Sequence, residues 1–172
     1  MILRYNLNVW KKNYKGENKM VDLEKYTGKW YEIASIPQWF QKGCTNTTAE
    51  YADKGKFIEV KNTCDVDTGK KQCDDTICKP IYKEKQKIGK AFTTKNPNLL
   101  RVQFFFPFKG DYLVEHVDTD YSHAIVGNKN KKYLWILSRK PEISEAKEKE
   151  LYQIIEEKGY DLSKLRKTYQ KK

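Results

Sequence analysis

The feature that most constrains this chain is a series of eight short segments that are rich in β-branched and aromatic residues. Several of them alternate apolar with polar side chains, as strands with one buried face do. Turn residues such as Asp53-Lys54-Gly55 and Asn96-Pro97-Asn98 separate neighbouring segments. This spacing predicts an all-β domain, an antiparallel barrel or sandwich, with strands over about residues 29–138. The eight segments are 30–36, 45–51, 57–63, 88–94, 100–106, 112–118, 123–128 and 132–138.

One amphipathic segment follows these strands and predicts a helix over about residues 144–158. Ser144 is placed to cap its first turn, and Gly159 suits its C-terminal end. Leu151 and Ile155 form part of a narrow apolar stripe among Lys and Glu residues. We expect this helix to lie on the outside of the barrel. The sequence has no run of 18 or more apolar residues of the kind that spans a membrane as a helix.

The net charge of +11, from 34 Lys and Arg against 23 Asp and Glu, raises the question of nucleic-acid binding. Residues 1–20 carry +4 and residues 164–172 carry +5, which leaves +2 for residues 21–163. Only four of the basic residues are Arg, the side chain suited to bidentate phosphate recognition. We therefore expect no nucleic-acid partner. Two interpretations stay open: a Lys-rich composition without function, or weak association of the basic N-terminal arm and C-terminal tail with anionic membranes.

Four cysteines fall within 35 residues: Cys44, Cys64, Cys73 and Cys78. An even, clustered set predicts two disulfides and an oxidising compartment, and three pairings are open. The spacing lacks the paired C-x2-C of zinc sites and both histidines are distant in sequence, so we expect no metal. Residues 65–87 are interpreted as a long polar loop. Residues 1–20 lack the apolar stretch of a signal peptide. The expected location, secreted or in an endomembrane or vacuolar lumen, therefore requires a leader that is not present in this chain.

Three motifs occur in order around the strands: GKWYEIASIP at 28–37, Asp118-Thr119-Asp120-Tyr121, and YLWILSRKP at 133–141. Together they resemble the signature motifs of the lipocalin family. Over about residues 21–168 the chain is most similar to the bacterial lipocalin and apolipoprotein D branch, and its composition and long loop suggest a protozoan member. The resemblance implies a single domain over residues 21–172, an eight-stranded up-and-down antiparallel barrel, or calyx, that holds a small apolar ligand.

The signature residues of these motifs are Gly28, Trp30, Asp120, Tyr121 and Arg139. The resemblance implies that Arg139 packs across Trp30 and closes the base of the barrel. A guanidinium over an indole ring is a favourable cation–π contact. We interpret this pair as structural and do not expect it to contact a ligand.

An eight-stranded barrel is about the size that holds one small ligand. Alternation along the strands predicts which side chains face inward, and Tyr51 matches a cavity position by resemblance. The same alternation also fits a filled barrel without a cavity. The candidate cavity residues are Ala34, Ile36, Tyr51, Ile58, Val60, Asn62, Val102, Phe104, Phe106, Tyr112, Val114, His116, Tyr133 and Trp135.

On the implied topology all four cysteines lie at the open end of the barrel. Alternation points Cys44 outward and Cys64 inward, which counts against a bridge between them. We therefore expect Cys64 to pair within the loop over residues 65–87 and Cys44 to reach that loop. Many relatives tie the Cys44 position to the C-terminal tail, but the tail KTYQKK contains no cysteine for that bridge.

No catalytic constellation emerges, so we expect a non-catalytic protein without a cofactor. The first hypothesis is transport or sequestration of a small hydrophobic ligand of the fatty acid, lysophospholipid, steroid or tetrapyrrole class. His116 is expected to be a hydrogen-bonded interior histidine, and haem ligation by it stays open. The alternative is a filled-barrel interaction module that acts on anionic membranes or a protein partner through its tails and mouth loops. The sequence leaves a homo-oligomer open.

Overall fold

The structure, a computed structural model, describes residues 20–38, 41, 43–74 and 76–171. The expected N-terminal arm lies outside the described residues except for its last residue, and it stays a prediction. The elements are α1 (Leu23–Tyr26), β1 (Gly28–Ile36), β2 (Cys44–Asp53), β3 (Ile58–Cys73), β4 (Cys78–Thr93), β5 (Leu99–Phe105), β6 (Phe108–Val117), β7 (His123–Gly127), β8 (Leu134–Ser138), α2 (Glu145–Glu157), the 3-10 helix η3 (Leu162–Lys164) and β9 (Arg166–Lys167).

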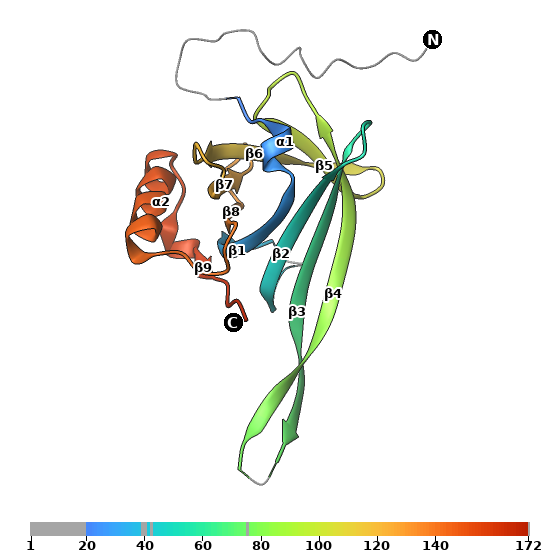
Figure 1. The fold of residues 1–172 in the computed structure, drawn as a ribbon, viewed down its shortest axis with the longest axis vertical. Coiled ribbons are helices and arrows are strands. Elements are labelled where there is room, and N and C mark those ends of the chain that lie inside the picture. Colours follow the sequence, from blue (N-terminus) through green and yellow to red (C-terminus); the bar gives the residue numbers. More distant parts are fainter. Residues whose placement is uncertain (1–19, 39–40, 42, 75, 172) are drawn as a thin grey trace.

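The strands form one antiparallel sheet that closes on itself. Neighbouring strands pair in order from β2 to β8, and β1 pairs with both β8 and β2. The two-residue strand β9 adds to β1 outside this ring. Closure leaves the eight barrel strands without a free edge along their paired lengths. The predicted eight-stranded antiparallel barrel is therefore confirmed, with α2 on its outside (Figure 1).

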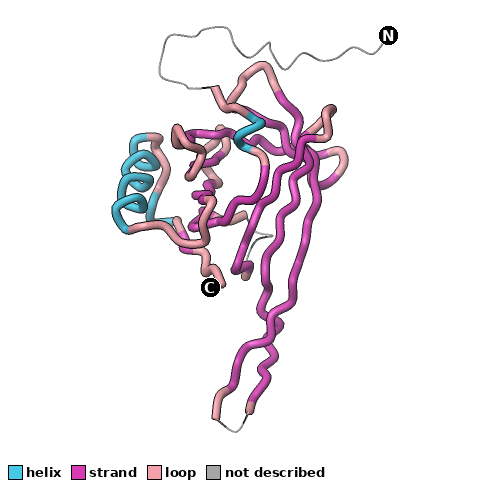
Figure 2. Tube along the Cα trace, in the orientation of Figure 1, coloured by secondary structure: helices cyan, strands magenta, loops and turns pink. Residues whose placement is uncertain are grey.

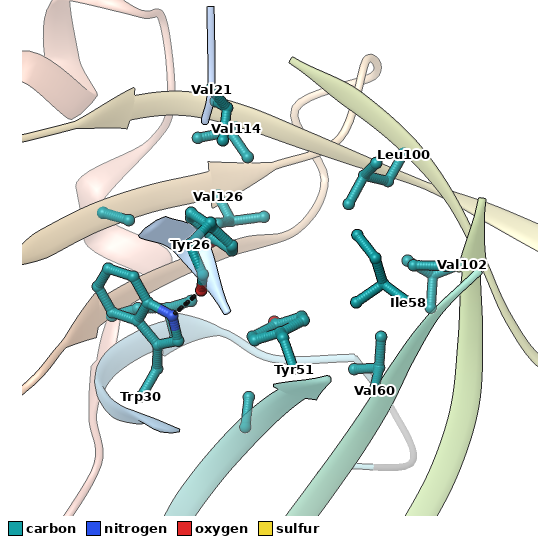
Figure 3. Packing of buried hydrophobic residues seen from close by; sticks show 14 of the residues in the cluster. Val21, Tyr26, Trp30, Tyr51, Ile58, Val60, Leu100, Val102, Val114 and Val126 are labelled. Carbon is teal, nitrogen blue, oxygen red and sulfur yellow. Dashed lines mark hydrogen bonds between the residues drawn. The ribbon is translucent and has the colours of Figure 1, made fainter. Parts of the chain in front are cut away.

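Apolar side chains form two clusters, one inside the barrel and one between the barrel and α2. Trp30 and Val60 belong to the interior cluster (Figure 3). Leu151 and Ile155 of α2 are fully buried in the second cluster with Ile125 of β7. Burying an aliphatic side chain of this size stabilises the fold by roughly 1.5–3 kcal/mol. The narrow apolar stripe of α2 is thus enough to hold the helix on the barrel wall.

The ends of α2 are defined by the residues that flank it. The Ser144 side chain accepts a hydrogen bond from the Lys147 backbone N–H at 3.2 Å, as an N-cap residue does. Gly159, with φ of 81°, follows the last turn in a conformation that favours glycine. In the described part of the chain, no helix combines the length and apolar character needed to cross a bilayer.

A β-bulge in β1 changes which of its side chains face inward. Glu32 pairs with Leu137 of β8, but Ala34 pairs with the next residue, Ile136, so β1 carries one extra residue. Beyond the bulge, Ala34 and Ile36 belong to the cluster under α2 rather than to the interior. Their prediction as cavity residues is wrong, because one inserted residue moves every later side chain to the opposite face.

A second bulge, in β6, has the same effect on His116. Val114 pairs with Val126 of β7, whereas His116 pairs with the adjacent Ile125. Ile125 packs under α2, so His116 also lies on the outer face of the barrel wall. The prediction that His116 is an interior residue is therefore wrong, for the reason that applies to Ala34.

Residues 65–87, predicted as a polar loop, instead form the outer halves of β3 and β4. They run away from the barrel as a two-stranded ribbon (Figures 1 and 2). Asp67 pairs with Tyr82 and Lys71 with Pro80, with an irregularity between them at Gly69, whose φ is 72°. The Asp-Thr-Gly sequence thus makes a bulge within a strand rather than a chain reversal. Most side chains of the ribbon are exposed on both faces.

Two disulfides are present, and the predicted pairing is wrong. Cys44 is bonded to Cys64 across β2 and β3, and Cys73 is bonded to Cys78 at the end of the ribbon. The register of β2 against β3 shifts between Thr45 and Thr48, so strict alternation does not hold between them. This irregularity lets Cys44 and Cys64 meet with their Cα atoms 5.5 Å apart.

The C-terminal segment is docked along β1 rather than extending from the fold. The Gln170 side-chain amide donates hydrogen bonds to the backbone carbonyl oxygens of Glu32 and Thr47, at 2.7 and 2.9 Å. The Lys171 ammonium lies 2.6 Å from Asp65 Oδ2 of β3. Hydrogen bonds and an ion pair therefore fix the end of the chain against β1, β2 and β3.

Candidate ligand-binding cavity

The barrel contains a cavity of about 350 Å³ whose lining reaches the exposed side chains of Phe105 and Phe108, where β5 turns into β6. This turn marks the open end, or mouth. The volume lies at the lower end of the range for small-molecule sites, roughly 300–1,000 Å³. Half of the candidate cavity residues line it: Tyr51, Val60, Asn62, Val102, Phe104, Tyr112 and Trp135.

The remaining candidates lie elsewhere in the barrel. Ile58 and Val114 belong to the interior cluster but do not line the cavity. Tyr133 lies before β8, with its ring centroid 6.4 Å from that of Trp135, and is not part of the lining. Phe106 is 90% exposed, so its inward placement is wrong. β5 ends at Phe105, and alternation does not extend into the turn that follows.

Trp30 and Arg139 close the end of the barrel opposite the mouth. The Arg139 guanidinium carbon lies 3.7 Å from the centroid of the Trp30 ring. Arg139 also donates hydrogen bonds of 2.8–2.9 Å to the backbone carbonyl oxygens of Lys25, Thr27 and Lys29. One side chain thus ties α1, the start of β1 and the end of β8 together, and both charge and stacking stabilise the contact.

The other signature residues belong to the same closed end. Gly28, with φ of 93°, takes a conformation that favours glycine, and a Cβ there would lie 3.4 Å from Arg139 Nη1. The Tyr121 hydroxyl accepts a hydrogen bond from the Asp22 backbone N–H at 2.7 Å. Asp120 accepts one from the Ser122 backbone N–H at 3.0 Å within the turn. None of these residues lines the cavity.

Three tyrosines form a hydrogen-bonded group at the cavity floor: Tyr51 and Tyr112 line the cavity, and Tyr26 belongs to the interior cluster without lining it. The Tyr112 hydroxyl lies 2.8 Å from that of Tyr26 and 2.7 Å from that of Tyr51. Burial raises the pKa of all three, so the hydroxyls stay neutral. Two hydrogen bonds use two of the three hydroxyl protons, and no other described residue accepts the third. The floor can therefore donate one hydrogen bond to a ligand.

Glu32 of β1 lines the cavity as a buried carboxyl. Burial raises the pKa of Glu32, while hydrogen bonds from Thr168 at 2.6 Å and Ser35 at 2.8 Å act in the opposite direction. Thr168 belongs to the docked C-terminal segment. The Glu32 carboxyl therefore lines the cavity and also accepts a hydrogen bond from the C-terminal segment.

A smaller pocket of about 110 Å³, which we call the annex, adjoins the cavity at the mouth. The two share Thr47, Asn62 and Phe104 in their walls. The annex is further lined by the Cys44–Cys64 disulfide and by side chains of β4 where the ribbon leaves the barrel. The sequence did not predict the β4 residues Lys85, Gln86 and Lys87 as lining, because the polar run 65–87 gave no strand signal.

Both histidines of the chain lie outside the barrel. Asp118 accepts hydrogen bonds from His116 Nε2 and His123 Nδ1, at 3.0 and 2.8 Å, and Lys147 of α2 lies 3.1 Å from the same carboxylate. Burial acts to raise the pKa of Asp118, but these hydrogen bonds hold it at about 2. The cluster links the β6–β7 turn to α2. Neither histidine faces the cavity, so haem ligation by His116 from the interior is excluded.

Sequence reasoning missed several lining residues that come from the ends of strands and from turns. They lie where alternation is broken or where no strand was expected. Leu137, on the same face of β8 as Trp135, and Thr47, at an even spacing from Tyr51, could have been found from alternation. The missed residues include Gln38, Gln41, Thr47, Phe105, Phe108, Lys109 and Leu137. No group of His, Cys, Asp or Glu among the described residues has an arrangement that could hold a metal ion.

Comparison with known proteins identifies the family of this barrel. The model of the lipocalin-like domain matches residues 21–170. The chain belongs to the lipocalin family. Temperature-induced lipocalin-1 of Arabidopsis thaliana is 37% identical over 161 residues, which cover 88% of this chain and 81% of the relative. Outer membrane lipoprotein Blc of Escherichia coli strain K12 is 36% identical over 147 residues, 83% of this lipocalin and 76% of Blc.

These relatives confirm the branch indicated by the sequence motifs, that of the bacterial lipocalins and apolipoprotein D. Among solved structures, lobster apocrustacyanin A1 matches with a TM-score of 0.65 over 87% of this lipocalin and 79% of that chain. The sequence identity in that match is 19%, so the match supports the fold alone.

Proposed function

We propose that this lipocalin binds a small hydrophobic ligand in its barrel cavity, for transport or sequestration and without catalysis. The observation that carries the proposal is the cavity of about 350 Å³, whose lining surface is mainly apolar and which opens at the mouth. Lipocalins generally bind small hydrophobic ligands. Two disulfides are typical of proteins in an oxidising compartment. We propose such a compartment for this protein as well.

The shape and chemistry of the cavity favour a slender ligand. Its volume is at the lower end of the usual range, which suits an alkyl chain better than a bulky tetrapyrrole. Each buried CH2 contributes roughly 0.8 kcal/mol, so a chain of moderate length binds without a polar anchor. With His116 on the outer face, a haem would have no histidine ligand from this barrel. We therefore propose the fatty acid or lysophospholipid class over the tetrapyrrole class.

Tryptophan fluorescence tests the proposal directly. Of the described tryptophans, Trp135 lines the cavity and Trp30 lies at the closed end. Titration with a long-chain alcohol is expected to change the emission saturably, and Trp135→Phe is expected to remove most of the change while the alcohol still binds by calorimetry. Absence of saturable binding for all chain lengths tested would contradict the proposal.

A second candidate function is docking of the mouth onto an anionic membrane. Phe106 and Phe108 are 90% and 77% exposed in the β5–β6 turn, and Lys87 and Lys109 lie beside this turn. Exposed aromatic side chains flanked by lysines suit the interface of a bilayer that contains anionic lipid. Such docking would place the cavity opening next to lipid, which fits a lipid ligand.

Vesicle co-sedimentation tests this second candidate. Binding to phosphatidylserine-containing vesicles is expected to exceed binding to phosphatidylcholine vesicles and to fall with salt. The double variant Phe106→Ser and Phe108→Ser is expected to lose most of it. Tyr169→Ser, which removes an exposed aromatic ring from the C-terminal segment, serves as the control. Equal losses in both variants would argue against docking through the mouth.

A further inference from the structure

The annex differs from the main cavity in the charge of its walls. Lys85 and Lys87 of β4 line it, on the face that the ribbon shares with the barrel interior. Lys85 pairs in register with the buried Cys64, whereas the acids Asp65 and Glu84 form the next pair and point to the opposite face. The annex therefore collects positive charge without the acids that neighbour it in sequence.

These two lysines have no ion-pair partner among the described residues. Other lysines nearby are neutralised: Lys61 lies 3.0 Å from Glu50, and Lys171 lies 2.6 Å from Asp65. Lys87 instead lies over the ring of Phe105, with its ammonium 3.2 Å from the ring centroid, and Lys85 forms no ion pair. The Phe105 contact holds the Lys87 ammonium at the boundary between annex and cavity.

Two neutral groups in the annex also lack partners. Thr47 Oγ1 is buried, and neither it nor the Asn62 side-chain amide forms a hydrogen bond with a described residue. A buried polar group without a partner costs roughly 1–3 kcal/mol, so such groups are expected to meet a ligand or water. A hydroxyl, an amide and two ammonium groups thus surround one small space, and all of them can donate to oxygen.

We propose that the annex binds the negatively charged head of a single-chain amphiphile, a carboxylate or a phosphate, while its alkyl chain lies in the main cavity. This inference rests on the proposed function and specifies its ligand class. Val60 lines the deep part of the cavity and Cys64 the annex. The four residue steps from Val60 to Cys64 span about 13 Å of strand, a length that an alkyl chain can bridge. The head would displace no ion pair within the described part of the chain, because Lys85 and Lys87 form none there.

The test compares ligands that share one chain and differ in the head. Dodecanoate, dodecyl phosphate and dodecanol are each added to the full-length protein, and their affinities are measured by displacement of a neutral fluorescent probe. We expect the two anions to bind about tenfold more tightly than the alcohol at low salt, a difference of about 1.4 kcal/mol. Added salt is expected to weaken binding of the anions and to leave the alcohol unchanged. Inorganic phosphate alone is expected not to displace the probe.

The variants separate the annex from general charge. The double variant Lys85→Gln and Lys87→Gln is expected to lose about tenfold in affinity for the anions and to keep the affinity for dodecanol. Lys90→Gln removes a lysine from the outer face of the same strand, where it lies over Phe57. This single substitution is expected to change the affinity for the anions by less than twofold. Thr47→Val, which removes only the unpartnered hydroxyl, is expected to weaken anion binding by about threefold.

The outcomes distinguish this inference from the proposed function. Equal affinity for the anions and dodecanol would overturn the annex as the head-group site. So would an equal loss of anion affinity in Lys90→Gln and in the double variant of the annex lysines. Neither result would contradict binding of a hydrophobic ligand in the cavity. Displacement of the probe by inorganic phosphate would indicate a free-anion site instead. Failure of all three dodecyl ligands to bind would instead contradict the proposed function. Unchanged melting temperatures would show that the variants are folded.

Discussion

The closed end and the mouth of this barrel contain similar side chains, but the side chains at the mouth have fewer hydrogen-bond and ion-pair partners. At the closed end, Arg139 contacts Trp30 and three backbone carbonyls, and three tyrosine hydroxyls bond one another. At the mouth, Lys85 and Lys87 form no ion pair with any residue that the structure describes, and aromatic rings are exposed. The comparison indicates that the closed end contributes stability, whereas the mouth keeps unused interactions for a ligand or surface.

The largest expected effect on stability comes from substituting a tryptophan at the closed end, and a tryptophan at the cavity wall is the matched comparison. Trp30 is fully buried in the interior cluster, whereas Trp135 is half-buried at the cavity wall. Trp30→Ala is expected to lower the free energy of unfolding by about 3–5 kcal/mol, because it leaves a large void beneath Arg139. Trp135→Ala is expected to cost less than half of that and mainly to weaken ligand binding. Urea denaturation measures both, and a larger cost for Trp135→Ala would break the comparison.

The next effect concerns the disulfide at the mouth. Replacing Cys44 and Cys64 together by Ser releases β2 from β3 and is expected to cost about 3 kcal/mol, as for other bridges that close loops of this size. Hydrogen exchange should increase at the mouth ends of β2 and β3 and stay slow around Trp30. The control is the double variant Cys73→Ser and Cys78→Ser. The Cys73–Cys78 bridge joins residues only five positions apart, so its loss is expected to cost less free energy of unfolding. Uniform loosening of the whole barrel would contradict the prediction.

A somewhat smaller effect is expected when the guanidinium of Arg139 is exchanged for an ammonium. Arg139→Lys keeps the charge, but its ammonium is a single compact centre and lacks the two separate guanidinium nitrogens that reach the carbonyls of Lys25, Thr27 and Lys29. We expect a loss of about 2 kcal/mol in the free energy of unfolding, with ligand affinity unchanged. Thermal unfolding and probe displacement measure the two quantities. A change in affinity without a change in stability would place Arg139 in the site instead.

The smallest expected effect is a pH dependence from Glu32. Because the pKa of Glu32 is raised in the fold, the native state holds its proton more tightly, so its contribution to stability falls as pH rises from its ordinary pKa through the raised value. Glu32→Gln keeps the oxygen that accepts from Ser35 and Thr168 and should stabilise the protein above that range, by about 1.4 kcal/mol for each unit of the shift.

Asp118 is expected to change the pH dependence of stability in the opposite direction, and at lower pH. Its pKa of about 2 means that its stabilising contribution is present above its ordinary pKa and is lost as pH falls toward 2. Asp118→Asn should therefore flatten the acid limb of the stability curve, whereas Glu32→Gln should flatten the decline at higher pH. Unfolding measured by urea across the pH range separates the two. Identical pH profiles for the wild type and Glu32→Gln would contradict the raised pKa of Glu32.

Much of the barrel could be predicted because its signals are local. Alternation placed Val60 and Val102 inward, the family resemblance placed Tyr51 there, and Ser144 and Gly159 marked the ends of α2. Three of the errors share one cause. Ala34, Ile36 and His116 follow β-bulges, which have no clear residue signature and reverse the inward and outward assignment beyond them. Phe106 was placed by extending alternation past the last residue of a strand.

The sequence by itself determined the strand series, the family motifs and the helix, because period, turn residues and caps depend on a few neighbouring residues. Only the tertiary structure decided the disulfide pairing, the ribbon formed by residues 65–87 and the docking of Gln170 and Lys171. Each of these depends on which backbone groups of distant strands come into register. The annex belongs with them, because Lys85, Thr47 and Cys64 meet only once β2, β3 and β4 have paired.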